Sequence, residues 1–180
     1  GCEVAAHSYV HDMNKVYGGD YIYAGHYGPK ENLEQIRKGV EAINKIKPDS
    51  VNGVRIPYSH FNEYTYDAME KLDVKWTSNL GSDDFVVPGQ GFGSAPFQIQ
   101  LGEKLYPIVE IPIDSQTYDW PIWVADEKSN EMFVKAVKYY CDLKNIPFER
   151  TPNGAVDIWN QRIKDTIENQ TVFTFICHPI

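Results

Sequence analysis

Two kinds of hydrophobic pattern alternate along the first half of this chain of 180 residues. Short apolar runs at 4–6, 51–56 and 74–76 are typical of buried strands. Between these runs, apolar residues recur three or four positions apart, which predicts amphipathic helices with one buried face. The first helix is expected to begin at Pro29 and to stop at Pro48. Its predicted inward residues are Leu33, Ile36, Val40, Ile43 and Ile46.

A second, shorter helix is predicted after the strand at 51–56. Asn62 is a suitable cap for it, because an Asn side chain accepts hydrogen bonds from the first turn of a helix. The predicted inward residues are Tyr66, Met69 and Leu72. The order of strand, loop, helix, strand, helix and strand implies parallel strands that are joined by helical crossovers.

The stretch from 78 to 102 breaks this order. It is rich in Gly and Pro, and we expect a long surface loop there. Its glycines at 89–93 resemble a nucleotide-binding loop only superficially, because they open no apolar helix and no Lys-Ser/Thr pair follows.

The remaining elements are predicted from the same patterns. We expect a strand at 106–113, a helix from Asp126, a further helix, and a last strand at 171–177. The first of these two helices has Phe133, Val137, Tyr140 and Cys141 as inward candidates, and the second has Val156, Trp159, Ile163 and Ile167.

Composition narrows the class of protein. A hydrophobic content of 42% and a charged content of 23% are those of a soluble globular protein, and the length suits one domain over residues 1–180. The net charge of −8 argues against nucleic acid as a partner, because phosphate binders need clustered Lys and Arg. No apolar run approaches the ~20 residues of a membrane helix. Three widely spaced cysteines allow at most one disulfide.

Two histidines lie just past the first predicted strand. His7 and His11 are four positions apart, so a helical turn that begins at His7 would place both imidazoles on one face. Two such imidazoles can chelate one divalent metal, at ~2.0–2.1 Å for zinc. A third ligand is then needed, and a carboxylate is expected. The alternative is a helix N-terminus that happens to carry two histidines.

Other polar residues also follow predicted strands. Arg55 lies at the end of the second strand, Asp119 follows the strand at 106–113, and His178 follows the last strand. In a parallel α/β barrel the carboxyl ends of the strands share one face, where active sites form. These positions therefore predict one site. Each residue also has an alternative role: a structural ion pair for Arg55, a loop cap for Asp119 and a core histidine for His178.

Four motifs resemble those of the polysaccharide deacetylases, carbohydrate esterase family 4. Residues 1–11 resemble the stretch with the metal-binding His-Ser/Thr-x-x-His motif. Residues 55–58, Arg-Ile-Pro-Tyr, are similar to the family's Arg-x-Pro-Phe/Tyr motif. Asp119-Trp120 resembles its Asp-Trp motif, and residues 175–179 resemble its closing strand, which ends in histidine. The order of the motifs agrees along the whole chain.

The resemblance implies a distorted (β/α)7-type barrel. The family's first motif, a strand that ends in Asp-Asp, would lie upstream of residue 1, and Asp83-Asp84 follows the wrong strand to replace it. We therefore expect an incomplete barrel that lacks its first strands, within a single, N-terminally truncated catalytic domain over residues 1–180. The upstream segment of the same protein is the expected partner, and it would supply the catalytic base and the third metal ligand.

The resemblance further implies a hydrolase that removes N-acetyl or O-acetyl groups from a polysaccharide or an amino sugar. One divalent metal, with zinc expected first, would be held by His7 and His11. His178 would protonate the leaving amine, Arg55 would orient the base, and Asp119 would tune one of these two residues.

The resemblance implies three substrate-binding residues, Pro57, Tyr58 and Trp120. The backbone N–H of Tyr58 would stabilise the oxyanion, and Trp120 would line the acetyl pocket. An extracellular or cell-envelope location is expected from the resemblance. Two alternatives stay open: an inactive member of the family that binds glycan or has a structural role, and a related C–N hydrolase that acts on a small cyclic amide.

Overall fold

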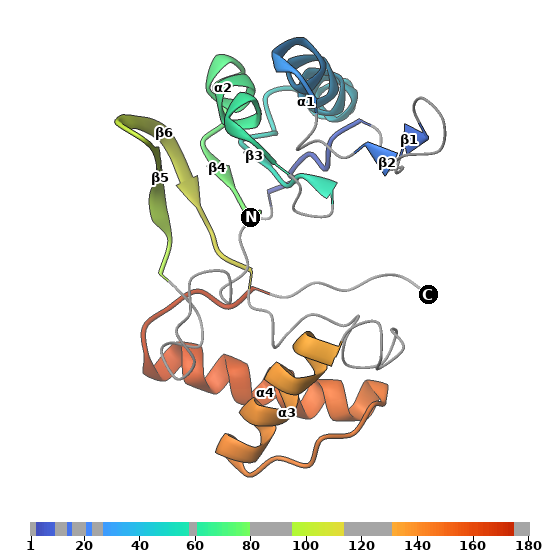
Figure 1. The fold of residues 1–180 in the computed structure, drawn as a ribbon, viewed down its shortest axis with the longest axis vertical. Coiled ribbons are helices and arrows are strands. Elements are labelled where there is room, and N and C mark those ends of the chain that lie inside the picture. Colours follow the sequence, from blue (N-terminus) through green and yellow to red (C-terminus); the bar gives the residue numbers. More distant parts are fainter. Residues whose placement is uncertain are drawn as a thin grey trace. The chain divides into compact units, whose positions relative to one another are not determined.

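The computed structural model describes residues 3–9, 14–15, 21–22, 27–57, 61–79, 95–113 and 131–174. The chain divides into two compact units, and each is described by itself (Figure 1). The first unit consists of Gly1–Leu80 and Pro96–Ile111, and the second of Gly81–Ala95 and Pro112–Ile180. The expectation of one domain over residues 1–180 stays a prediction.

A four-stranded sheet forms the centre of the first unit, with the strand order β3-β4-β6-β5. Strands β3, β4 and β6 are parallel, and β5 pairs antiparallel with β6. The bounds are Gly53–Val54 for β3, Trp76–Thr77 for β4, Phe97–Leu101 for β5 and Lys104–Glu110 for β6. The predicted parallel arrangement is therefore confirmed for β3, β4 and β6.

The N-terminal segment extends this sheet beside β3. Ala6 forms a parallel bridge with Val54. Its N–H donates to the carbonyl of Gly53 at 3.0 Å, and its carbonyl accepts from the N–H of Arg55 at 2.8 Å. The predicted first strand thus pairs at its end, immediately before His7. Among the described residues the sheet does not close, and the predicted barrel is not confirmed.

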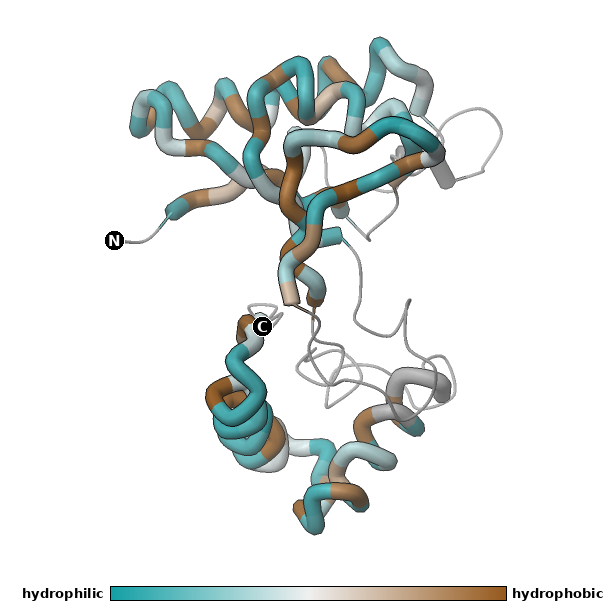
Figure 2. The backbone as a smooth tube through the Cα atoms, turned by 90° about the vertical axis from the view of Figure 1, so that its left-hand side faces the viewer, coloured by the Kyte–Doolittle hydropathy of each residue, from teal (hydrophilic) through white to brown (hydrophobic). Residues whose placement is uncertain are grey.

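Two helices cover the sheet of this unit. Helix α1, Pro29–Asn44, begins at the predicted proline. Helix α2, Glu63–Lys71, begins after Asn62, whose side chain accepts from the N–H of Thr65 at 3.1 Å, as predicted. The core that both helices bury against the strands includes Ile36, Tyr66, Met69, Val54 and Ile108. Figure 2 shows hydrophobic and hydrophilic residues interleaved along both helices. Ile46 was expected to face inward but is 88% exposed, because helix α1 ends before it.

One strand was missed. Residues 97–101, predicted as part of a loop, form β5, which makes a hairpin with β6 through Gly102 at φ +59°. Glycine reaches this backbone conformation without strain. Within β5, Ile99 is buried while Gln98 and Gln100 are exposed, so the alternation of a strand is present in the sequence. The surrounding Gly and Pro residues obscured it.

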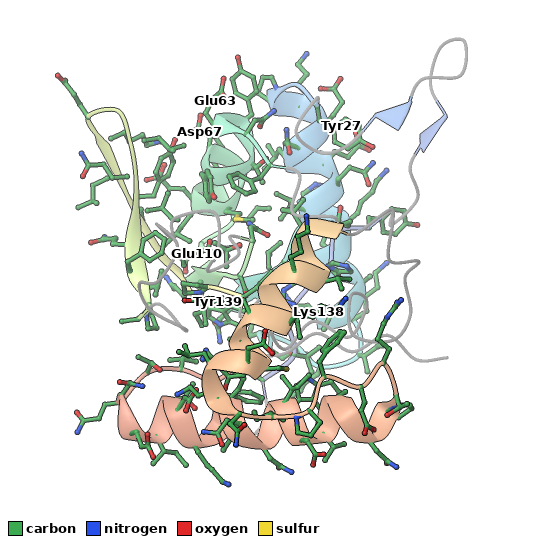
Figure 3. The ribbon with its side chains drawn as sticks, turned by 60° about the horizontal axis from the view of Figure 1, so that its bottom comes forward. Tyr27, Glu63, Asp67, Glu110, Lys138 and Tyr139 are labelled. Carbon is green, nitrogen blue, oxygen red and sulfur yellow. The ribbon has the colours of Figure 1, made fainter. Side chains whose placement is uncertain are left out.

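The hairpin is attached to α2 by charged side chains. Lys104 Nζ lies 2.7 Å from Asp67 Oδ1 and 2.8 Å from Glu70 Oε2. The hydroxyl of Tyr106 donates to the same Asp67 oxygen at 3.0 Å. Figure 3 labels Asp67 on this helix. A further short pair, β1 (Asn14–Lys15) with β2 (Tyr21–Ile22), is antiparallel.

Two helices form the described core of the second unit. They are α3, Glu131–Lys144, and α4, Pro152–Glu168. Thr151 caps α4 by accepting from the N–H of Gly154 at 3.0 Å. As predicted, the buried residues of α3 include Val137, Tyr140 and Cys141. The side chain of Phe133 and the residues at 126–130 lie outside the described part of the chain.

The buried face of α4 differs from the prediction. Val156, Ile163 and Ile167 are 46%, 39% and 71% exposed, and only Trp159 of the predicted set packs against the core. The residues that are buried instead are Ala155, Ile158, Arg162, Asp165 and Thr166. The prediction was wrong because a hydrophobic pattern cannot identify a buried face that includes an ion pair.

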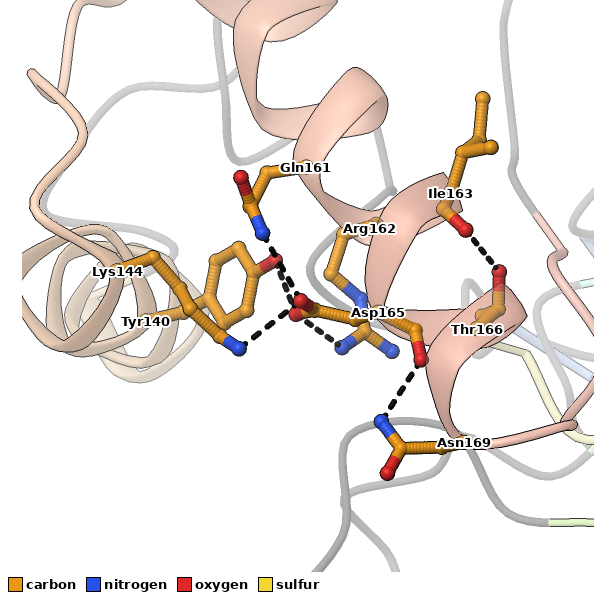
Figure 4. A network of polar contacts seen from close by, with 8 residues as sticks. All are labelled: Tyr140, Lys144, Gln161, Arg162, Ile163, Asp165, Thr166 and Asn169. Carbon is orange, nitrogen blue, oxygen red and sulfur yellow. Dashed lines mark hydrogen bonds and ion pairs between the residues drawn. The ribbon is translucent and has the colours of Figure 1, made fainter.

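Asp165 is the centre of this buried polar contact (Figure 4). It accepts from the hydroxyl of Tyr140 at 2.8 Å, from Lys144 Nζ at 2.9 Å and from Gln161 Nε2 at 3.0 Å. Arg162 Nη1 lies 3.6 Å away. Burial by itself would raise the pKa of Asp165, but these hydrogen bonds and the charge of Lys144 lower it below its ordinary value.

The last predicted strand is not seen over its described part. Residues 171–174 have no regular secondary structure, and 175–177 lie outside the described residues. Thr174 Oγ1 donates to the carbonyl of Pro112 at 2.8 Å. None of the helices that the structure describes combines the length and apolar character needed to cross a membrane.

Candidate active site at the strand ends

The carboxyl ends of the parallel strands bring together polar residues from four parts of the chain. His7 follows the bridge at Ala6, Arg55 follows β3, Ser78 follows β4, and Glu110 is the last residue of β6. In parallel sheets this edge is where binding and catalytic residues gather. We call the side chains of His7, Arg55, Thr77, Ser78, Asn79 and Glu110 the strand-end network.

His7 is oriented by the next strand. Its Nδ1 lies 2.9 Å from the carbonyl oxygen of Arg55. Because a carbonyl oxygen only accepts, Nδ1 carries the proton, and the ring lone pair lies on Nε2. A backbone carbonyl that holds one ring nitrogen in this way is the usual support of a metal-binding histidine. The imidazole is also exposed, so its geometry and tautomer fit a metal ligand.

The backbone after His7 is shaped by helix α1. Ser8 has a φ of +59°, in the left-handed region. A Cβ atom on Gly39 of α1 would lie 2.6 Å from the carbonyl oxygen of Ser8, so only a glycine allows this approach. The packing of α1 therefore defines where the segment after His7 runs.

Arg55 makes a directed contact across the sheet. Its Nη2 donates to the hydroxyl of Ser78 at 2.7 Å, and that hydroxyl donates to the carbonyl of Ile111 at 2.6 Å. Ser78 thus accepts from one strand end and donates to another. The guanidinium, which stays charged at all relevant pH values, is held at the strand ends by this contact.

Asn79 holds the backbone next to Arg55. Its Oδ1 accepts from the N–H of Ile56 at 2.7 Å, and its Nδ2 donates to Thr77 Oγ1 at 2.7 Å. Thr77 Oγ1 in turn donates to the carbonyl of Val54 at 2.7 Å. These directions determine which side-chain atom of Asn79 is the oxygen. Asn79 and Thr77 are fully buried, so the contacts are shielded from water.

A buried carboxylate completes the network. Glu110, at the end of β6, accepts from the N–H of Asn79 at 2.7 Å (Figure 3 labels Glu110). It is fully buried. Burial raises the pKa of the Tyr66 hydroxyl, and the negative charge of Glu110 adds to that shift.

Sequence reasoning identified only part of this site. His7 and Arg55 lie at the predicted strand ends and contact each other, and Pro57 is buried just beyond. Thr77, Ser78, Asn79 and Glu110 were missed. Their signal was available: the run Thr77-Ser78-Asn79 directly follows the strand predicted at 74–76, and Glu110 interrupts an apolar strand.

The other predicted site residues lie outside the described part of the chain, and their roles stay predictions. They are His11, Tyr58, Asp119, Trp120 and His178. Within the described residues, no three His, Cys, Asp or Glu side chains gather as a metal site. Among the described residues, the case for a metal site therefore rests on His7. Its Nε2 can bind a metal while its Nδ1 is held by the Arg55 carbonyl.

Comparison with known proteins supports the resemblance. Residues 1–77 match the family model of the polysaccharide deacetylases. This range contains His7, His11 and the motif at 55–58. The fold of the chain is similar to the crystal structure of a candidate polysaccharide deacetylase from Mycobacterium smegmatis, with a TM-score of 0.62 and 16% sequence identity. The match to the family model relates residues 1–77 to the polysaccharide deacetylases, and the structural likeness shows a similar fold.

The structural likeness covers nearly all of this chain but only about half of the other chain. It covers 97% of this chain and 49% of the Mycobacterium smegmatis chain, so this chain spans about half the length of that structure. At such low identity the likeness establishes a shared mixed α/β fold. A comparison with curated proteins found no match.

Proposed function

We propose that this chain acts as a metal-dependent hydrolase that removes N-acetyl or O-acetyl groups from a polysaccharide or an amino sugar. One observation carries the proposal: His7 and Arg55 lie at adjacent parallel strand ends, joined by a contact of 2.9 Å, inside the region that matches the deacetylase family. The same contact leaves the lone pair of His7 on Nε2, as metal binding requires.

The metal would be held by His7 and His11, with a carboxylate as the expected third ligand. Zinc is the first choice for imidazole ligands of this kind, although cobalt and nickel also suit them. When bound, a divalent metal polarises the acetyl carbonyl and lowers the pKa of a bound water. The contribution of this chain is to hold the His7 ring in one orientation through the Arg55 carbonyl.

The other proposed residues would orient the catalytic base, donate a proton to the leaving group, stabilise the oxyanion or line the acetyl pocket. Arg55 would orient the catalytic carboxylate. His178 would donate a proton to the leaving amine nitrogen, and Asp119 would tune His178 or Arg55. The backbone N–H of Tyr58 would donate to the oxyanion. Trp120 would line the acetyl pocket.

A carbohydrate substrate follows from the family, whereas the polymer is not specified by any residue described. The proposal includes the extracellular or cell-envelope location expected from the resemblance. The net charge of −8 argues against nucleic acid as a partner.

The test combines metal content with acetate release. We expect about one zinc per chain and release of acetate from acetylated chito-oligosaccharides, in this chain or in a form that is extended upstream. His7→Ala should abolish both, and Ser50→Ala, far from the strand ends, should change neither.

Two outcomes would contradict the proposal. Absence of bound metal in both forms would favour a glycan-binding or structural member of the family. Turnover of small cyclic amides without turnover of acetylated sugars would favour the related C–N hydrolase.

A further inference from the structure

The Ser78 hydroxyl both accepts a hydrogen bond from Arg55 and donates one to the backbone. Arg55 Nη2 donates to Ser78 Oγ at 2.7 Å, and Ser78 Oγ donates to the Ile111 carbonyl at 2.6 Å. The hydroxyl therefore has one acceptor role and one donor role, which orients it completely. Ser78 is 3% exposed, so water does not compete for these bonds.

Asn79, the residue after Ser78, holds the backbone next to Arg55. Asn79 Oδ1 accepts from the N–H of Ile56, and Asn79 is itself held by Thr77 and Glu110. The pair that follows β4 thus contacts both the side chain of Arg55 and the backbone beside it. Such double support is what holds a functional group within a fraction of an ångström.

We propose that Ser78 is a positioning residue that holds the guanidinium of Arg55 in the orientation that the reaction needs. The inference rests on the proposed function for its effect on turnover, and on the geometry alone for its effect on Arg55. A hydrogen bond from a charged donor restrains the guanidinium more than a neutral one, and a misplaced charge stabilises the transition state less. Loss of Ser78 therefore lowers kcat and leaves KM unchanged, because Ser78 itself does not touch the substrate.

The first experiment observes Arg55 directly by NMR of the arginine side-chain nitrogens. In the wild type, the bonded Nη2 should rotate slowly about its Cζ–Nη2 bond. Ser78→Ala should speed this rotation and shift the Nη2 resonance, and Ser78→Thr, which keeps the hydroxyl, should retain the wild-type behaviour. Ser50→Ala is the matched control, because Ser50 also donates to a backbone carbonyl, that of Lys47 at 2.7 Å, away from the strand ends.

The second experiment measures kinetics on acetylated chito-oligosaccharides in the form of the protein that releases acetate. Ser78→Ala should lower kcat about tenfold to a hundredfold, the effect of one lost hydrogen bond to a charged group. KM should stay near the wild-type value, and Ser78→Thr should restore most of kcat. Ser78→Ala should also lower the melting temperature, because the Ile111 carbonyl loses its donor, so kcat is measured well below that temperature. A kcat near the wild-type value under these conditions would overturn the proposal.

The two readouts separate the proposals. Unchanged Arg55 resonances in Ser78→Ala would overturn the positioning role whatever the activity. Absence of acetate release from the wild type would overturn the proposed function, while the NMR comparison would still decide whether Ser78 holds Arg55.

Discussion

Gly39 of helix α1 faces the carbonyl oxygen of Ser8, and a Cβ atom at Gly39 would lie 2.6 Å from it. That distance is well inside van der Waals contact, so the helix and the segment that carries His7 have no room for a side chain between them. The candidate metal ligand therefore depends on a residue 32 positions away that contributes no chemistry of its own.

Gly39→Ala should destabilise the protein, although Gly to Ala inside a helix ordinarily stabilises by about 0.5–1 kcal/mol. The expected loss is about 1–3 kcal/mol, the usual cost of an overpacked contact. Displacement of Ser8 should also weaken zinc binding at His7. Urea unfolding and a zinc titration measure both effects, with Lys30→Ala on an exposed position of α1 as the control. A gain in stability for Gly39→Ala would contradict the close approach.

Gly53 and Trp76 form a second contact of this kind. A Cβ atom on Gly53 would lie 2.1 Å from the indole ring of Trp76, whose Nε1 donates to Glu3 Oε1 at 3.0 Å. Gly53→Ala should push the indole away from Glu3 and cost about 1–3 kcal/mol. A change in the tryptophan fluorescence of the folded state, together with a lower urea midpoint, would show this. Unaltered fluorescence and stability would mean that Trp76 does not cover Gly53.

Asn79→Ala should destabilise the first unit by about 1–3 kcal/mol, because the buried N–H of Ile56 loses its acceptor. Asn44→Ala is the matched control, since Asn44 Oδ1 accepts from the N–H of Ser50 at 3.2 Å in a more exposed place. There, water can replace the lost partner. Chemical unfolding of both variants gives the comparison, and equal losses would argue against a special role of burial at Asn79.

Asp165 should make stability depend on acid pH. Its pKa in the folded state is lower than the ordinary value of 3.8, so the folded state binds fewer protons than the unfolded state in this range. Its contribution is present above pH ~4 and is lost as the pH falls through the lower, folded pKa. The free energy of unfolding, measured from pH 6 down to about pH 2, should fall with pH, and we call this fall the acid limb.

Asp165→Asn should flatten that limb and also lower stability at neutral pH. The expected loss is about 3–5 kcal/mol, because it removes one partner from a buried charged contact with Lys144 and Arg162. Glu34→Gln is the control, since Glu34 pairs with Lys38 on an exposed helix surface, where water screens the pair and its loss should change stability little. An unchanged acid limb in Asp165→Asn would assign the pH dependence to other carboxylates.

Several features were predictable because their causes are local. The start of α1 at Pro29 follows from the fixed φ of proline, and the cap at Asn62 follows from a side chain that reaches three residues ahead. The positions of His7 and Arg55 at parallel strand ends follow from the alternation of strands and helices. The chain itself determined these elements and two residues of the candidate site.

Other features were decided only by tertiary structure. The contacts of Asn79 with Ile56 and with Glu110 join residues that are 23 and 31 positions apart. Such pairs depend on which strands become neighbours, and β4 lies between β3 and β6 only in the assembled sheet. The buried face of α4 has the same origin, because Arg162 and Asp165 are tolerated inside only where Tyr140 and Lys144 meet them. Burial of a polar group depends on partners that local sequence does not contain, and this is why the strand-end network became visible only in the fold.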